Sequence, residues 1–218
     1  MSELPYKTIS VSGPDAFEFL QNLLTNDLRL LETEAEIFAA FCNPKGRVIW
    51  FGTVYATESG YTMSVAIDLA ENIVQRLTMF QFRSRVEFAI EEGGTVNAES
   101  LIANGYPAIG RAQSELFTPH MLNLDLLGAV SVDKGCYPGQ EVVARTHYRG
   151  ATKRRMLRFE SSAPVSPGDK VSDGERDIGE VLNASGDDLL AVVPIDKANQ
   201  GLIVNGAALV NCPLPYLQ

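Results

Sequence analysis

The sequence is poor in the side chains that bind metals and form disulfides. It contains three cysteines, Cys42, Cys136 and Cys212, and two histidines in 218 residues. An odd number of widely spaced cysteines favours a reducing compartment over a disulfide framework. Neither a CxxC nor an HxxxH pattern occurs, so we predict no metal ligands and no preformed zinc or cluster site within one chain.

Long hydrophobic runs are also missing. No apolar stretch approaches the ~20 residues that a membrane helix needs, and the N-terminus lacks the basic and apolar segments of a secretion signal. We therefore expect a cytoplasmic protein with no membrane partner. Asp and Glu outnumber Lys and Arg by 27 to 18, which gives a net charge of −9. This excess of negative charge argues against general nucleic-acid binding.

One segment departs from this acidic balance. No acidic residue occurs between Val142 and Phe159, whereas six basic residues do: Arg145, Arg149, Lys153, Arg154, Arg155 and Arg158. We call this segment the basic window. It is either a solvated face or a docking site for a polyanion, such as a polyglutamyl tail, a phosphate or RNA. An RNA contact is possible on this pattern but not favoured.

The most informative stretch is the motif Lys134-Gly-Cys-Tyr-Pro-Gly-Gln-Glu141. Its glycines permit backbone shapes that other residues resist, and a short helix is predicted from Gln140 onward. Cys136 would then precede a helix N-terminus, where aligned N–H groups and nearby Lys134 stabilise a thiolate. The alternative is a tight loop whose buried cysteine acts only as a small apolar residue.

Two other features of this helix bear on chemistry. His147 lies eight residues past Gly139, roughly 12 Å along the axis, which is too far to activate Cys136 directly. A cysteine hydrolase is therefore disfavoured. Glu141 and Arg145 are spaced i, i+4 and are expected to form an ion pair on the helix surface.

Hydrophobic periodicity predicts an α+β fold followed by a small antiparallel β-barrel or sandwich. The predicted domains are 1–150 and 151–218. In the first domain, Ser12 and Asp68 are expected to cap helices, the turn Asn43–Gly46 to close a hairpin, and residues 91–97 to form a polar turn. Predicted strands are 4–11, 36–41, 47–56, 61–67, 85–90, 154–159, 170–171, 178–183, 189–193 and 207–210, and predicted helices start near Pro14, Leu69 and Ala98.

The motif resembles the signature of the YgfZ family, K-G-C-Y-x-G-Q-E, and the flanking segments 117–125 and 144–150 resemble that family as well. Residues 13–27 are similar to the opening of the related glycine-cleavage T-protein, a folate-dependent aminomethyltransferase. The resemblance implies a T-protein/YgfZ-like N-terminal α+β domain and a C-terminal barrel. It also implies tetrahydrofolate binding and a role in iron–sulfur cluster assembly or repair that supports tRNA modification by iron–sulfur enzymes. Folate and iron–sulfur proteins or assembly factors are the implied partners.

Two departures from the related families matter. The T-protein strand that carries its essential aspartate has Trp50 and Phe51 at the matching positions here, so we expect no aminomethyl transfer. A central module of the longer relatives is replaced by a short connection before Gly105-Tyr-Pro-Ala-Ile109. We therefore expect a more open folate pocket, or one whose wall is completed by a second copy of the chain.

Candidate site residues follow from the motif and the resemblance together. Cys136 is the candidate reactive thiol, and the motif residues are Lys134, Gly135, Cys136, Tyr137, Gly139, Gln140 and Glu141. The candidate folate-binding residues are the aromatics Tyr6, Trp50, Phe51 and Tyr137 and the cations Arg145 and Arg149. An active aminomethyl- or methyltransferase and an RNA- or protein-binding module remain the competing functions. Cys136 is open to three roles, as a reactive thiol, a transient cluster ligand or a structural residue.

Overall fold

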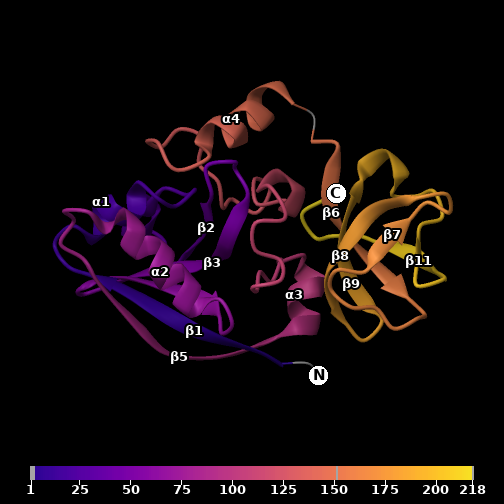
Figure 1. Ribbon diagram of the computed structural model, residues 1–218, viewed down its shortest axis with the longest axis horizontal. Coiled ribbons are helices and arrows are strands. Elements are labelled where there is room, and N and C mark those ends of the chain that lie inside the picture. Colours follow the sequence, from indigo (N-terminus) through magenta and orange to yellow (C-terminus); the bar gives the residue numbers. More distant parts are fainter. Residues whose placement is uncertain (1–2, 151, 218) are drawn as a thin grey trace.

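The computed structural model describes residues 3–150 and 152–217. Figure 1 shows an N-terminal sheet with helices beside a C-terminal β-barrel, with helix α3 between the two and helix α4 across one end. The predicted α+β fold with an antiparallel barrel is confirmed. No helix in the described part of the chain is long and apolar enough to cross a membrane.

The N-terminal sheet has five strands in the order β2-β3-β4-β1-β5, all paired antiparallel. The strands β4 and β5 both pair with β1, so the connection through helix α2 crosses over β1. Buried side chains of β1, β3 and α2, among them Ile9, Trp50 and Leu77, share one core. The elements are β1 (Glu3–Ser12), α1 (Ala16–Gln21), η1 (Leu28–Glu32), β2 (Ile37–Cys42), β3 (Val48–Thr57), β4 (Gly60–Ala66), α2 (Ala70–Gln81) and β5 (Glu87–Asn97).

The predicted polar turn at 91–97 is wrong, because β5 continues through Asn97 along β1. This half of β5 lies at the edge of the sheet and is largely exposed. Without a buried face it carries no alternation of apolar and polar residues, so its sequence does not indicate a strand. Gly93 packs under Tyr6, where an added Cβ would lie 2.4 Å from the Tyr6 carbonyl oxygen.

Both predicted helix caps are wrong, because Ser12 is the last residue of β1 and the Asp68 carboxylate is taken by a tertiary contact. Helix α1 begins after Asp15, whose carboxylate binds Arg85 at 3.0 Å. Helix α2 begins after Leu69, and the Asp68 carboxylate accepts the backbone N–H of Arg111 at 3.0 Å. Helix α1 ends after six residues, at Gln21. Buried Thr25 donates to the Ala129 carbonyl and draws the chain away from the helix.

The C-terminal barrel is closed, with the strand order β10-β11-β6-β9-β8-β7. A hairpin turn between Ser185 and Asp188 joins β8 to β9, and the short strand β10 is an addition to the predicted strands. The elements between the sheet and the end of the chain are α3 (Ala98–Asn104), η2 (His120–Leu122), α4 (Gln140–Arg149), β6 (Arg154–Ser161), β7 (Lys170–Ser172), β8 (Asp177–Ser185), β9 (Asp188–Pro194), η3 (Ile195–Lys197), β10 (Ile203–Val204) and β11 (Ala207–Cys212).

A second apolar core joins the sheet to the barrel. It contains Ala40 and Phe51 from the sheet together with Met156, Leu182 and Leu190 from the barrel, all nearly inaccessible to solvent. Burying such side chains is the main stabilising term of folding. The two parts therefore share one core, and the division at residue 150 into independent domains stays a prediction.

Candidate functional site

A cavity of about 620 Å³ lies between the sheet and the barrel. Its walls come from β1, β3 and β4, from the segment 106–110, and from Pro167, Asn183 and Ala184 of the barrel. Asn183 fixes this wall, because its side chain both donates to and accepts from the backbone of Ala108 at 2.9 Å.

Aromatic rings form one side of this central cavity. Phe38 lies between Phe51 and Tyr106, with ring centroids 5.3 Å and 5.1 Å away, and Tyr6 also lines the space. Of these rings, Tyr6 and Phe51 were predicted. Phe38 and Tyr106 were not predicted. Phe38 could have been found, because it lies on β2, the strand that pairs with the Phe51 strand β3. Such a slot suits a flat heterocycle, which aromatic side chains hold by stacking.

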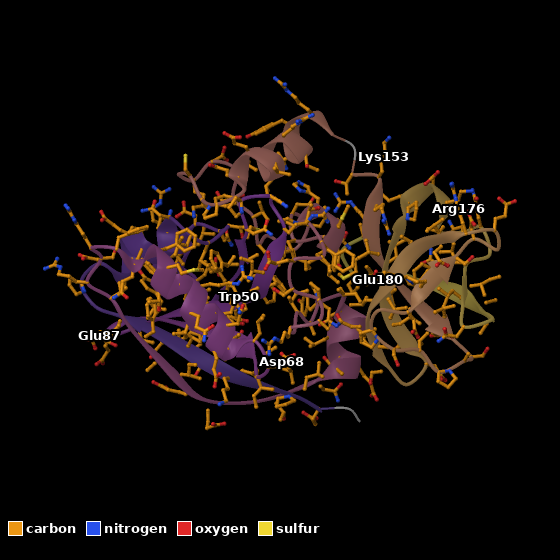
Figure 2. The ribbon with its side chains drawn as sticks, viewed as in Figure 1. Trp50, Asp68, Glu87, Lys153, Arg176 and Glu180 are labelled. Carbon is orange, nitrogen blue, oxygen red and sulfur yellow. The ribbon has the colours of Figure 1, made fainter. Side chains whose placement is uncertain are left out.

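Trp50 and Phe51 point to opposite faces of β3, because successive side chains of a strand alternate. Phe51 lines the cavity. Trp50 is fully buried in the first core, and its indole N–H donates to the Ser64 carbonyl oxygen at 2.8 Å. Figure 2 shows Trp50 inside the sheet domain. The structure therefore does not place Trp50 with the other predicted folate-binding residues.

The polar groups of the cavity are acidic or neutral. Asp68 and Glu36 supply carboxylates, and Gln113 and Asn183 supply amides. None of the described lining residues is a lysine or an arginine. A carboxylate accepts hydrogen bonds from amine and amide N–H groups, so this cavity suits a heterocycle with a donating edge rather than an anion.

The motif loop, residues 134–139, lies outside the lining of this cavity. Two of its side chains face inward, since Lys134 and Tyr137 are 5% and 6% exposed. The intervening Gly135 and Cys136 are exposed. Helix α4 begins directly after the loop, as predicted, with Gly139 as its N-cap. Cys136 is thus a solvent-facing thiol held between two anchored residues.

The loop is anchored at its end by close backbone packing. Gly139 has φ +80°, and an added Cβ would lie 2.5 Å from the Asn43 carbonyl oxygen and 2.7 Å from Gly46 Cα. Val142 of α4 also packs against Gly46, where an added Cβ would lie 2.9 Å from the Val142 Cβ. The hairpin turn is itself held by the Asn43 side chain, which accepts the backbone N–H of Lys45 at 2.9 Å. Glycine at 139 is therefore needed both for its conformation and for the close approach.

Electrostatic surroundings distinguish the three cysteines. Burial raises the pKa of Cys42 to about 12. Burial, with help from Glu160, also raises the pKa of the Cys212 thiol above its ordinary value. Cys136 alone of the three is exposed. Among the described residues, no group of three or more His, Cys, Asp or Glu side chains could hold a metal ion.

The basic window divides into two parts. Arg155 and Arg158 belong to the barrel and form ion pairs with Asp125 and Asp188, each at 2.8 Å. Arg145, Arg149 and Lys153 are exposed, and Figure 2 shows Lys153 pointing outward between α4 and the barrel. Arg145 and Arg149 do not line the central cavity.

The predicted Glu141–Arg145 ion pair is wrong, because the structure places these two exposed side chains more than 4.0 Å apart.

The two histidines meet each other rather than a cysteine. The rings of His120 on η2 and His147 on α4 have centroids 6.1 Å apart. His120 is buried, and neither of its ring nitrogens has a hydrogen-bond partner among the described residues. Burial lowers the pKa of His120. A neutral His120 therefore supports α4 by packing, and no Cys–His pair forms the basis of the site.

Comparison with known proteins agrees with this architecture. Residues 153–213 match the family model of the CAF17 C-terminal beta-barrel domain. Aminomethyltransferase T of the glycine cleavage system from Bartonella henselae superposes with a TM-score of 0.76 over 98% of this chain and 85% of that one, at 14% identity. The chain thus has a T-protein-like fold with a C-terminal barrel of the CAF17 type.

Sequence relatives narrow the class to a family. The tRNA-modifying protein YgfZ of Sodalis glossinidius is 38% identical over 53% of this chain and 40% of its own length. The mitochondrial iron–sulfur cluster assembly factor IBA57 homolog of Pyricularia oryzae is 24% identical over 69% of this chain and 54% of its own length. The chain therefore spans about half the length of these relatives. It is similar to members of the YgfZ family.

Proposed function

We propose that this chain is a folate-binding accessory factor of the YgfZ type in iron–sulfur cluster assembly or repair. In this role it supports tRNA modification by iron–sulfur enzymes without catalysing aminomethyl transfer itself. The observation that carries the proposal is the separation of two sites, a central cavity with aromatic rings and carboxylates, and an exposed thiol outside it. The names of its relatives, a tRNA-modifying protein and a cluster assembly factor, agree with this role.

The cavity fits the pterin end of tetrahydrofolate. Phe38, Phe51 and Tyr106 offer faces for the ring system, and the Asp68 and Glu36 carboxylates can accept from its amino and amide N–H groups. Tetrahydrofolate would supply one-carbon chemistry when bound. The described lining offers its glutamate tail no cation, so the tail would extend toward solvent.

Transferase chemistry is disfavoured by the residues on β3. The positions that match the aspartate of the T-protein hold Trp50, which is buried away from the cavity, and Phe51, which contributes an apolar ring. Neither can accept a proton or stabilise a cation by charge. The general RNA-binding alternative is weakened because Arg155 and Arg158 are used inside the barrel by ion pairs.

Cys136 is proposed as the residue that meets the iron–sulfur partner, either as a nucleophile or as a transient ligand of a cluster carried by that partner. The test is complementation of a bacterial strain that lacks its own YgfZ protein, read as modified tRNA nucleosides by mass spectrometry. We expect the chain to restore these nucleosides, Cys136→Ala to abolish the effect, and Gly135→Ala to retain it. Equal activity of the Cys136→Ala variant would contradict a role for the thiol.

A further inference from the structure

Lys134 is an unusual lysine, because its ammonium group is buried and has no carboxylate partner among the residues that the structure describes. Its side chain is 5% exposed. The ammonium instead donates to two backbone carbonyl oxygens, those of Gln21 and Leu24. It also lies 5.2 Å from the centroid of the Tyr137 ring, within the range of a cation–π interaction. A buried charge is costly unless its donors are satisfied, so these contacts hold Lys134 in one position.

The two acceptors lie where α1 ends. Helix α1 finishes at Gln21, and the last carbonyl groups of a helix have no partner within it. Lys134 supplies the missing donor to the Gln21 carbonyl oxygen and also binds the carbonyl oxygen of Leu24, three residues later. The Gln21 side chain separately donates to Asp27 Oδ1 at 2.9 Å. A residue 113 positions away in the sequence thus completes the end of α1.

We propose that Lys134 is the positioning residue of the Cys136 thiol, because it clamps the start of the motif loop to the carbonyl oxygens at the end of α1. Gly139, packed against the hairpin turn, fixes the other end of the loop. Cys136 lies between these anchors, two residues after the clamp. The functional meaning of this geometry rests on the role proposed above for Cys136.

The charges around Lys134 agree with a clamp at neutral pH. Burial lowers its pKa to about 8, Asp27 acts in the opposite direction, and Arg29 adds to the lowering. Asp27 and Arg29 are themselves an ion pair, and they act on the pKa of Lys134 in opposite directions. The ammonium form still predominates at pH 7 and keeps all three donors available to the carbonyl groups.

The test compares Lys134→Met with Lys134→Arg and with Lys153→Met, a matched control at an exposed lysine. Iodoacetamide labelling of the full chain is followed by mass spectrometry, which reports Cys42, Cys136 and Cys212 separately. Amide hydrogen exchange is measured for residues 132–139 and 21–25. We expect Lys134→Met to slow Cys136 labelling at pH 7 at least threefold and to speed exchange in both segments at least tenfold. Lys134→Arg should fall between Lys134→Met and the unmodified chain, and Lys153→Met should change neither readout.

Unchanged labelling and exchange in Lys134→Met would overturn the proposal. Labelling of buried Cys42 in both Lys134 variants would also overturn it, because Lys134 would then hold the whole fold rather than one loop. Failure of the proposed function is a separate result. If Cys136 of the unmodified chain labels no faster than Cys212, the reactive-thiol role fails, while a response of the loop to Lys134→Met would still support the clamp.

Discussion

Gly139→Ala tests the anchoring of the motif loop against the hairpin turn. Alanine at φ +80° costs about 1–2 kcal/mol. Its Cβ would also lie 2.5 Å from a backbone oxygen, and relieving such overpacking costs about 1–3 kcal/mol. Alanine also restricts the unfolded chain more than glycine does, which stabilises the folded state by roughly 0.4–1 kcal/mol. The expected loss is therefore about 2–4 kcal/mol of the free energy of unfolding, or on the order of 10 °C in Tm for a chain of this size.

Gly135→Ala is the matched control, because it lies in the same loop and an added Cβ there meets nothing within 4 Å. We expect its effect to stay within about 0.5 kcal/mol. The assay is urea unfolding of both variants followed by circular dichroism, with the thermal midpoint as a second measure. Equal costs for the two alanines, or a cost below about 0.5 kcal/mol for Gly139→Ala, would refute the reasoning about this contact.

Three further predictions concern charge and ligand. The described cavity lining holds no lysine or arginine. The dissociation constants of tetrahydrofolate with one and with three glutamates, measured by calorimetry, should therefore agree within about twofold. An affinity more than about tenfold higher for the longer tail (roughly 1.4 kcal/mol) would show a cation site for the tail. Lys134 has a folded-state pKa of about 8, below the ordinary 10.5, so the unfolded state binds more protons between these values and stability from this residue rises with pH there. The free energy of unfolding of the unmodified chain minus that of Lys134→Met should therefore increase by about 2 kcal/mol from pH 7.5 to 10, and a flat or falling difference would contradict the buried ammonium. Finally, the purified chain should form no methylenetetrahydrofolate from aminomethylated carrier protein, whereas measurable turnover would restore the transferase alternative.

The parts of the fold that local chemistry determines could be predicted from the sequence. The turn at Asn43–Gly46 combines a side chain that accepts from the turn backbone with a glycine at positive φ, and both are local signals. The helix after Gly139 follows from apolar spacing alone. The edge half of β5 could not be predicted, because it pairs with β1, between 83 and 94 residues earlier, and its own faces are exposed.

The candidate site was predictable in part for the same reason. The alternation of side chains on β3 indicates that Trp50 and Phe51 lie on opposite faces of the sheet. Which face borders the cavity depends on the barrel, whose residues are distant in the sequence. Asp68 has the composition of a helix cap, and only the tertiary contact with Arg111 shows that it faces the cavity instead. Lys134 looks like a surface cation beside a cysteine until the end of α1 is placed against it.

The central claim, that folate and the thiol occupy separate sites, is tested most directly by calorimetric titration of tetrahydrofolate into four proteins. These are the unmodified chain, Asp68→Asn, Cys136→Ala, and Glu87→Gln as a surface control outside the cavity lining. Loss of a charge-assisted hydrogen bond costs about 1.5–3 kcal/mol, so Asp68→Asn should weaken binding roughly 10- to 100-fold. Cys136→Ala and Glu87→Gln should bind like the unmodified chain. No binding by the unmodified chain, or a loss on Cys136→Ala equal to that on Asp68→Asn, would contradict the account.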